Sequence, residues 1–188
     1  VGDFSTHDLG NALNPYLDAI ADEMVDAGCK ERHTVVFLPL IETSQKFCNM
    51  LKQRGFSAAE VNGESQDRAE VLSDFATGEY NVLCNSMLLT EGWDCPLVAC
   101  IVVLRPTKVR SLYCQMVGRG TRLSPETRKS HLLLLDFLWN TQSMERVRPA
   151  HLIAGSADVS QRATDIVADA GAPVDLMEVV ETASEDVV

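Results

Sequence analysis

The sequence has no apolar run approaching the roughly 20 residues that a membrane-spanning helix needs, so we expect no membrane association. It has no Cys-x-x-Cys pair, which argues against a zinc site, although Cys95 and Cys100 with a histidine remain a less favoured ligand set. Most of its six cysteines lie among apolar residues, as reduced, buried thiols do. The sequence begins Val-Gly-Asp-Phe, without an initiator Met and without a basic segment followed by an apolar leader. We therefore expect an excised fragment of a longer, non-secreted protein.

The sequence also lacks the phosphate-binding loop G-x-x-x-x-G-K-[ST], and no glycine-rich turn follows its first expected strand. This absence argues against a self-contained nucleotide site, including one of the Rossmann type. The 188 residues, 46% of them hydrophobic and 23% charged, have the composition of one globular domain with at most a modest appendage.

The charge is acidic overall but unevenly distributed. A net charge of −11 by itself argues against nucleic-acid binding. Residues 141–188 carry nine acidic residues against three arginines, whereas residues 105–129 carry seven basic residues against Glu126 alone. A local basic stretch of this kind can still bind phosphate.

Short apolar runs alternate with segments of helical periodicity, which predicts βαβ units and a mostly parallel sheet. A helix is expected to open at Asn14–Pro15, and Thr43 or Ser44 is expected to cap the helix that follows the first strand. Strands are expected at 34–38, 58–61, 80–84, 99–104 and 131–136, and two short acidic helices at 161–170 and 174–183.

The segment 115–122, Q-M-V-G-R-G-T-R, has the strongest chemical signal. Its glycines permit close backbone approach, and Arg119 and Arg122 are spaced to project from one side of a helix. Paired guanidiniums suit a multi-oxygen anion such as phosphate. The alternative is a solvated helix end with incidental arginines.

Two other segments supply small polar groups where ligands bind an open α/β sheet, at the carboxyl ends of strands. One follows the first strand and contains Thr43, whose alternative role is helix capping. The other spans residues 85–96, where Trp93 either stacks on a base or fills a gap in the core. We expect segment 115–122 at the same edge.

These segments, in this order, resemble motifs IV, V and VI in the second RecA-like domain of superfamily 2 DEAD/DEAH-type helicases. The matching segments are V-V-F-L-P at 35–39 with Thr43, T-E-G-W-D-C-P at 90–96 and Q-M-V-G-R-G-T-R at 115–122. The residues of these motifs are most similar to those of RadD-like and phage helicases, and next most similar to those of restriction-enzyme motor subunits. Ordered motifs are far more specific than any one of them.

The resemblance implies a RecA-like three-layer αβα sandwich over residues 33–140, preceded by a linker and helix at 1–32 and followed by an acidic helical extension at 141–188. It implies site residues of three kinds: Arg119, Arg122 and Gln115 in catalysis, Gly92, Asp94 and Gly118 in nucleotide binding, and Thr43, Ser86 and Thr90 on the nucleic-acid backbone. No protein metal ligand is expected.

The family's cofactor is ATP with Mg²⁺, bound between two RecA-like lobes, and the Walker motifs lie on the first lobe. This sequence contains neither a Walker A loop nor a D-E-x-H run, so we expect half a site that is inactive alone. The expected partners are that N-terminal lobe and nucleic acid, DNA rather than RNA, in the cytoplasm of a bacterial or phage-infected cell. A non-catalytic RecA-like binding or scaffold module is the alternative.

Overall fold

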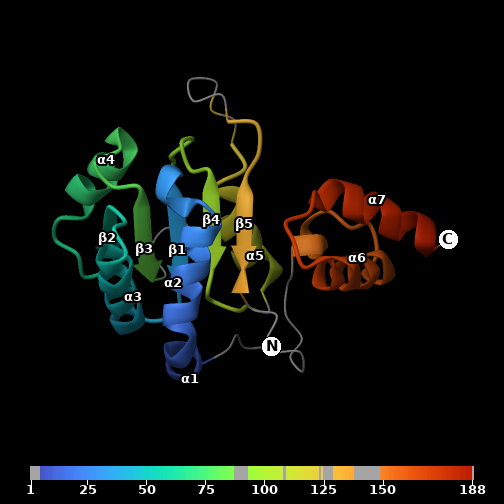
Figure 1. Cartoon of the computed structure of the whole chain (residues 1–188), viewed down its shortest axis with the longest axis horizontal. Helices are drawn as coiled ribbons and strands as arrows, with labels where there is room; N and C mark the ends of the chain where they lie inside the picture. Colours follow the sequence, from blue (N-terminus) through green and yellow to red (C-terminus); the bar gives the residue numbers. More distant parts are fainter. Residues whose placement is uncertain are drawn as a thin grey trace.

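Five parallel strands form one sheet in the order β2-β3-β1-β4-β5 in the computed structural model, which describes residues 5–86, 93–107, 109–122, 124, 129–137 and 149–187 (Figure 1). The strands are β1 (Thr34–Leu38), β2 (Ala58–Val61), β3 (Val82–Ser86), β4 (Cys100–Val103) and β5 (Leu133–Asp136). Every strand lies within two residues of its expected bounds. The prediction of a parallel sheet is therefore confirmed.

The central strand β1 shows why this sheet is buried on both faces. All five of its residues are buried. Because side chains alternate along a strand, they contribute to two separate cores, one on each face of the sheet. Val36 and Leu38 belong to one core, whereas Val35 and Phe37 belong to the other. A strand that is apolar at every position needs a helical layer on each face.

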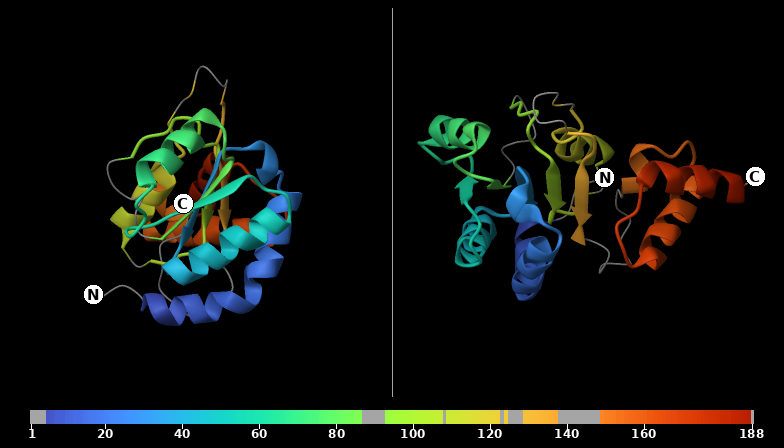
Figure 2. Two further views of the ribbon diagram at one scale, coloured as in Figure 1. Left: turned by 90° about the vertical axis from the view of Figure 1, so that its left-hand side faces the viewer. Right: turned by 45° about the horizontal axis from the view of Figure 1, so that its top comes forward.

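Two pairs of helices supply those layers (Figure 2). The helices α2 (Leu17–Asp26) and α3 (Ile41–Gln53) pack on one face, and α4 (Arg68–Thr77) and α5 (Arg110–Gly118) pack on the other. The result is the expected three-layer αβα sandwich. Among the helices of the described ranges, none is long and apolar enough to cross a membrane.

The N-terminal segment contains a helix that the sequence did not predict. The helix α1 (Thr6–Leu13) starts after Ser5, whose hydroxyl accepts a hydrogen bond from the Asp8 N–H at 3.4 Å. Asn14 and Pro15, expected to open the first helix, instead form the 3-10 turn η1 (Asn14–Tyr16) between α1 and α2. Gly10 lets α1 pack closely, because a Cβ there would collide with the Leu40 side chain.

The start of α3 also differs from the prediction. Its N-cap is Leu40, which provides no side-chain hydrogen bond, and the helix begins at Ile41. Thr43 and Ser44 lie inside the first turn and are buried, so the prediction that one of them caps this helix is wrong. The extended backbone of Leu40 lets the helix start directly after β1. Its first N–H groups therefore lie at the carboxyl end of β1 without a side-chain cap.

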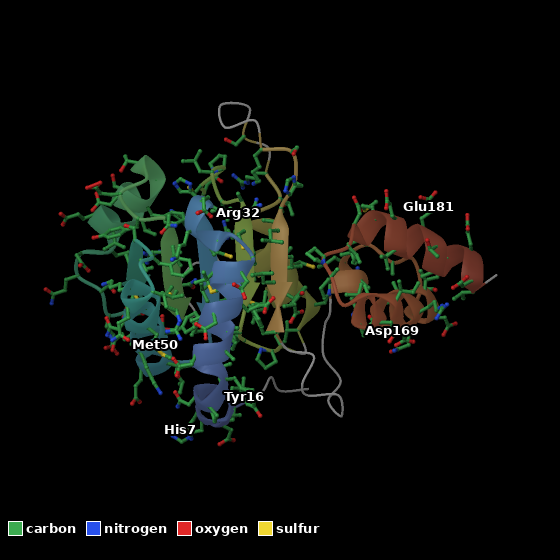
Figure 3. All side chains as sticks on the ribbon, in the orientation of Figure 1. His7, Tyr16, Arg32, Met50, Asp169 and Glu181 are labelled. Atoms are coloured by element: carbon green, nitrogen blue, oxygen red, sulfur yellow. The ribbon has the colours of Figure 1, made fainter. Side chains whose placement is uncertain are left out.

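The C-terminal residues form a small helical unit beside β5 (Figure 1). It consists of the 3-10 turn η5 (Pro149–Leu152), α6 (Ala157–Ala170) and α7 (Leu176–Asp186), packed around a core of alanine and valine. Asp169 and Glu181 project outward from opposite sides of the helix pair (Figure 3). The predicted acidic helical extension is confirmed, with α6 starting earlier than expected and α7 both starting and ending later.

Candidate functional site

The structure places the predicted segments at two opposite edges of the sheet. Residues 118–122 follow α5, which runs back from the end of β4 towards the start of β5. In Figure 1 the arrows of β4 and β5 point downward, so the amino ends of these strands lie towards the top of the view. The expectation that segment 115–122 lies at the carboxyl edge is therefore wrong, and it is also wrong for Trp93 and Asp94 of segment 85–96, which lie beside Arg119 and Arg122. The helix returns the chain to the amino edge, as every parallel crossover must.

The amino edge brings together Trp93, Asp94, Arg119 and Arg122, which we call the arginine site. Arg122 Nη1 forms an ion pair with Asp94 Oδ2, and the two side chains are 54% and 50% exposed. Arg119 is half-buried and donates a hydrogen bond to the Trp93 carbonyl. An exposed pair of this kind stabilises a fold by roughly 0–1 kcal/mol, so an incoming anion can compete for Arg122.

The two glycines of segment 115–122 have different neighbours. A Cβ on Gly118 would meet nothing within 4 Å, so the backbone there is open to an approaching ligand. A Cβ on Gly120 would collide with the Leu132 side chain, so this glycine is required by internal packing. Gln115 is exposed on α5. The predicted roles of Gln115 and Gly118 stay predictions, and both residues are accessible.

The carboxyl edge holds the residues predicted to contact nucleic acid. The side chains of Thr43 and Ser86 are only 3% and 4% exposed. Thr43 lies beneath α1, since a Cβ on Gly10 would come within 3.0 Å of its hydroxyl. The Ser86 hydroxyl is buried and has no hydrogen-bond partner among the described residues. Thr90 and Gly92 lie outside the described residues.

Trp93, Phe75 and His33 form an aromatic stack next to the arginine site. Trp93 packs on Phe75 with ring centroids 5.8 Å apart, and Phe75 meets His33 edge-to-face at 5.3 Å. Trp93 is partly buried against the core that contains Phe75, so it fills a gap there, which is the second of the two roles considered for it. The stack fixes the Trp93 backbone, whose carbonyl binds Arg119.

We expect acid to destabilise this stack through His33. Burial lowers the pKa of the His33 imidazole below its ordinary 6.5, although the Phe75 backbone opposes the shift. The unfolded chain therefore binds the proton more readily, and stability present above pH 6.5 is lost as the pH falls through the folded-state pKa. The unfolding free energy of the wild type should fall between pH 7.5 and 5.5, by at most about 1.4 kcal/mol per pH unit from this group.

Denaturant unfolding at a series of pH values tests this expectation. His33→Gln should flatten the dependence, whereas His7→Gln, at a side chain 77% exposed on α1, should leave it unchanged. Equal slopes for the wild type and His33→Gln would show that His33 does not control the stability of the stack.

Lys129 joins the arginine site, although the sequence marked it only as part of a basic stretch. Its ammonium donates hydrogen bonds to backbone carbonyls of the segment after α5. A lysine side chain that turns towards backbone carbonyls leaves no periodic pattern in a sequence. The one sequence signal for Lys129 is that it lies close to Arg122 along the chain, and that signal is weak.

The arginine site suits the phosphates and sugar of a nucleotide. Arg122 supplies an exposed guanidinium, Gly118 an open stretch of backbone, and Asp94 an exposed acceptor for hydroxyl groups. Within the described residues, no three His, Cys, Asp or Glu side chains cluster closely enough to hold a metal ion. All six cysteines are free thiols, five of them buried. Arg122, Gly118 and Asp94 together fit the phosphates and sugar of a nucleotide.

Residues 17–124, more than half of the chain, match the family described as "Helicase conserved C-terminal domain". The chain belongs to this family. The match includes the arginine site up to Ser124 and the whole sheet except β5. It confirms the second RecA-like domain of a superfamily 2 helicase that the motifs predicted.

Relatives of this helicase C-terminal domain include two yeast proteins. The chain is 38% identical to "Putative ATP-dependent helicase IRC3" of Saccharomyces cerevisiae over 96 residues, which are 50% of the chain and 14% of the relative. It is 41% identical to "Putative mitochondrial ATP-dependent helicase irc3" of Schizosaccharomyces pombe over 106 residues, 55% of the chain and 17% of the relative. The chain thus spans a small part of the length of these relatives.

A solved structure with the same fold is a fragment of a "putative HsdR subunit of a type I restriction enzyme" from Vibrio vulnificus YJ016. It superposes with a TM-score of 0.59 and 27% sequence identity over 71% of this chain and 29% of the other. The RecA-like fold expected from the motifs is confirmed by this likeness together with the parallel sheet.

Proposed function

We propose that this helicase C-terminal domain is the second motor lobe of an ATP-dependent helicase or translocase that acts on DNA. The observation that carries the proposal is the exposed Arg122 guanidinium beside open backbone at Gly118. A site that presents cations outward, with no phosphate loop of its own, suits a nucleotide brought by another lobe. The relatives named as ATP-dependent helicases support the same assignment.

In this proposal the two edges of the sheet have different tasks. Arg119, Arg122 and Gln115 at the amino edge act on the phosphates of ATP, with Asp94, Gly92 and Gly118 beside the nucleotide. The Walker A lysine and the acidic ligands of Mg²⁺ belong to an N-terminal lobe of the same protein. ATP hydrolysis then requires that both lobes close on one nucleotide, because each holds only part of the machinery.

The carboxyl edge is proposed to hold the nucleic-acid backbone. Thr43 and Ser86 are buried, so their hydroxyls contact a phosphate only after a local shift, whereas Thr90 is left as a prediction. The first turn of α3, which has no side-chain cap, is proposed to supply backbone N–H groups at this edge. Helix N-termini bind phosphate through such groups and through the helix dipole. In this proposal the buried Thr43 side chain fixes the orientation of the first turn of α3.

A motor subunit of a restriction-type enzyme is a second candidate. The likeness to the HsdR fragment favours it, since it covers more of this chain than either yeast relative does. The two candidates share ATP-driven movement on DNA and differ in duplex separation. Strand displacement on a forked duplex by the two-lobe protein indicates a helicase, and displacement of a bound protein roadblock without strand separation indicates a translocase.

ATP hydrolysis by the isolated chain and by the protein with its N-terminal lobe tests the proposal. We expect no hydrolysis above background for residues 1–188 alone, because the phosphate loop is missing. We expect hydrolysis by the two-lobe protein, stimulated more by DNA than by RNA of the same sequence. Robust hydrolysis by the chain alone contradicts the half-site. No hydrolysis by either form indicates the alternative, a non-catalytic binding or scaffold module.

A further inference from the structure

The ammonium of Lys129 binds three backbone carbonyls at the arginine site. Its Nζ lies 2.6 Å from the Gly120 oxygen, 2.7 Å from the Arg122 oxygen and 3.3 Å from the Pro96 oxygen. A lysine ammonium has three N–H donors and no acceptor, so the three carbonyls match its full capacity. The contacts to Gly120 and Arg122 are short, as charge-assisted hydrogen bonds are.

The three carbonyls belong to the two segments that form the site. Gly120 and Arg122 follow the end of α5, where carbonyls lose their partners within the helix and a cation is favourable. Pro96 lies two residues after Asp94, on the segment that carries both acceptors of the arginines. One side chain therefore ties the arginine-bearing turn to the segment that it contacts.

Lys129 is itself held in place by the backbone. It forms an isolated antiparallel bridge with Ser124, and its N–H donates to the Ser124 oxygen at 3.4 Å. Ser124 is only 4% exposed, so the bridge is anchored against the protein interior. The Lys129 side chain is half-buried, and this burial lowers the pKa of its ammonium. A partly desolvated ammonium makes stronger hydrogen bonds than an exposed one.

We propose that Lys129 is a positioning residue that holds the turn 118–122 and the segment 93–96 as one unit, so that Arg119 and Arg122 meet the nucleotide in the required geometry. This inference rests on the proposed function. Its energetic logic is that the ammonium ties the turn to segment 93–96 through the backbone, whereas the Arg119–Trp93 hydrogen bond and the Arg122–Asp94 ion pair tie it through the arginines that must meet the nucleotide. Without the ammonium, the three carbonyls accept hydrogen bonds from water instead, and residues 118–122 sample other positions.

Lys129→Met in the two-lobe protein tests the inference, because methionine keeps the length and removes charge and donors. We expect kcat for ATP hydrolysis to fall by about 10- to 100-fold, as misplacement of a catalytic group by about 1 Å does. The KM for ATP should change much less, since the arginines act mainly in the transition state. Lys129→Arg retains charge and several donors, so it should recover most of the lost rate.

Hydrogen exchange gives a readout that does not depend on activity. In Lys129→Met the amides of Gly120 and Thr121, which donate to Val117 and Gly118, should exchange faster, while those of α6 and α7 stay unchanged. Lys52→Met, the same substitution at an exposed lysine of α3, is the matched control and should change neither rate nor exchange. Should Lys129→Met fail to fold, Lys129→Gln replaces it, since it also removes the charge and keeps a polar side chain.

The outcomes separate this inference from the proposed function. If Lys129→Met keeps kcat within about twofold of the wild type while Arg122→Ala loses activity, Lys129 does not position the arginines. If Arg122→Ala also keeps full activity, the proposed role of the arginine site fails. A loss of kcat in Lys129→Met with unchanged exchange at Gly120 and Thr121 likewise contradicts positioning.

Discussion

Arg122→Ala, in the protein that carries both lobes, should lower kcat for ATP hydrolysis by about 10³-fold or more, which is the range for arginines that stabilise charge in phosphoryl transfer. The guanidinium is 54% exposed and bound to a single exposed carboxylate, so it is available to a nucleotide. Steady-state hydrolysis at saturating ATP and DNA measures the effect. Arg119→Ala should act in the same direction and should also loosen Trp93, whose carbonyl it binds.

The fold should survive the loss of Arg122. An exposed ion pair contributes roughly 0–1 kcal/mol, so the unfolding free energy should change by no more than that. Arg162→Ala is a matched control, because Arg162 is 49% exposed and paired with Asp186 on the C-terminal helices. It should leave kcat unchanged. If Arg122→Ala hydrolyses ATP at the wild-type rate, Arg122 does not stabilise the transition state.

Tyr113→Ala should have the largest effect on stability, a loss of about 3–5 kcal/mol, as for other large aromatic side chains removed from a core. Tyr113 is 0% exposed on α5, and its hydroxyl donates to Asp136 Oδ2 at 3.0 Å. Burial and the Asp136 carboxylate raise the pKa of Tyr113, so it remains a neutral donor at physiological pH. The side chain therefore anchors the helix that carries the arginine site, and denaturant unfolding of the chain measures the loss.

Tyr113→Phe separates packing from the hydrogen bond. It keeps the ring and removes only the hydroxyl, so we expect a smaller loss of about 1.5–3 kcal/mol, the range for a hydrogen bond to a charged group. Tyr16→Ala, at a ring 55% exposed, is the control and should change stability by about 0.5 kcal/mol or less. A loss below about 1.5 kcal/mol for Tyr113→Ala would show that α5 is held mainly by other contacts.

The separation of the two edges gives the mutants distinct expected signatures. Substitutions at Arg119, Arg122 or Lys129 should change hydrolysis with little change in DNA affinity, because these residues lie at the amino edge. Changes to the first turn of α3 should weaken DNA binding first, because that turn lies at the carboxyl edge. The core between them, which contains Phe37 and Val103, connects the edges through packed strands.

The sequence by itself determined the fold and the identity of the polar segments. Apolar strands such as 34–38 need burial on both faces, so their alternation with amphipathic helices specifies a layered parallel sheet. The spacing of Arg119 and Arg122 and the order of the three motifs are likewise local properties. Glycines at helix ends, such as Gly55 and Gly78 with positive φ, could also be predicted, because few other residues adopt that backbone.

Only the tertiary structure decided where those segments meet. The return of α5 to the amino edge placed Arg122 against Asp94, across 27 intervening residues of chain, and left Thr43 at the other edge. The packing of α1 through Gly10 against Leu40 and Thr43 covered the Thr43 hydroxyl, and Lys129 turned inward to three carbonyls. Burial and backbone acceptors depend on the whole chain around a residue, whereas periodicity and motif spacing depend only on its neighbours in sequence. For that reason the sequence predicted the arginines, and the structure revealed what holds them.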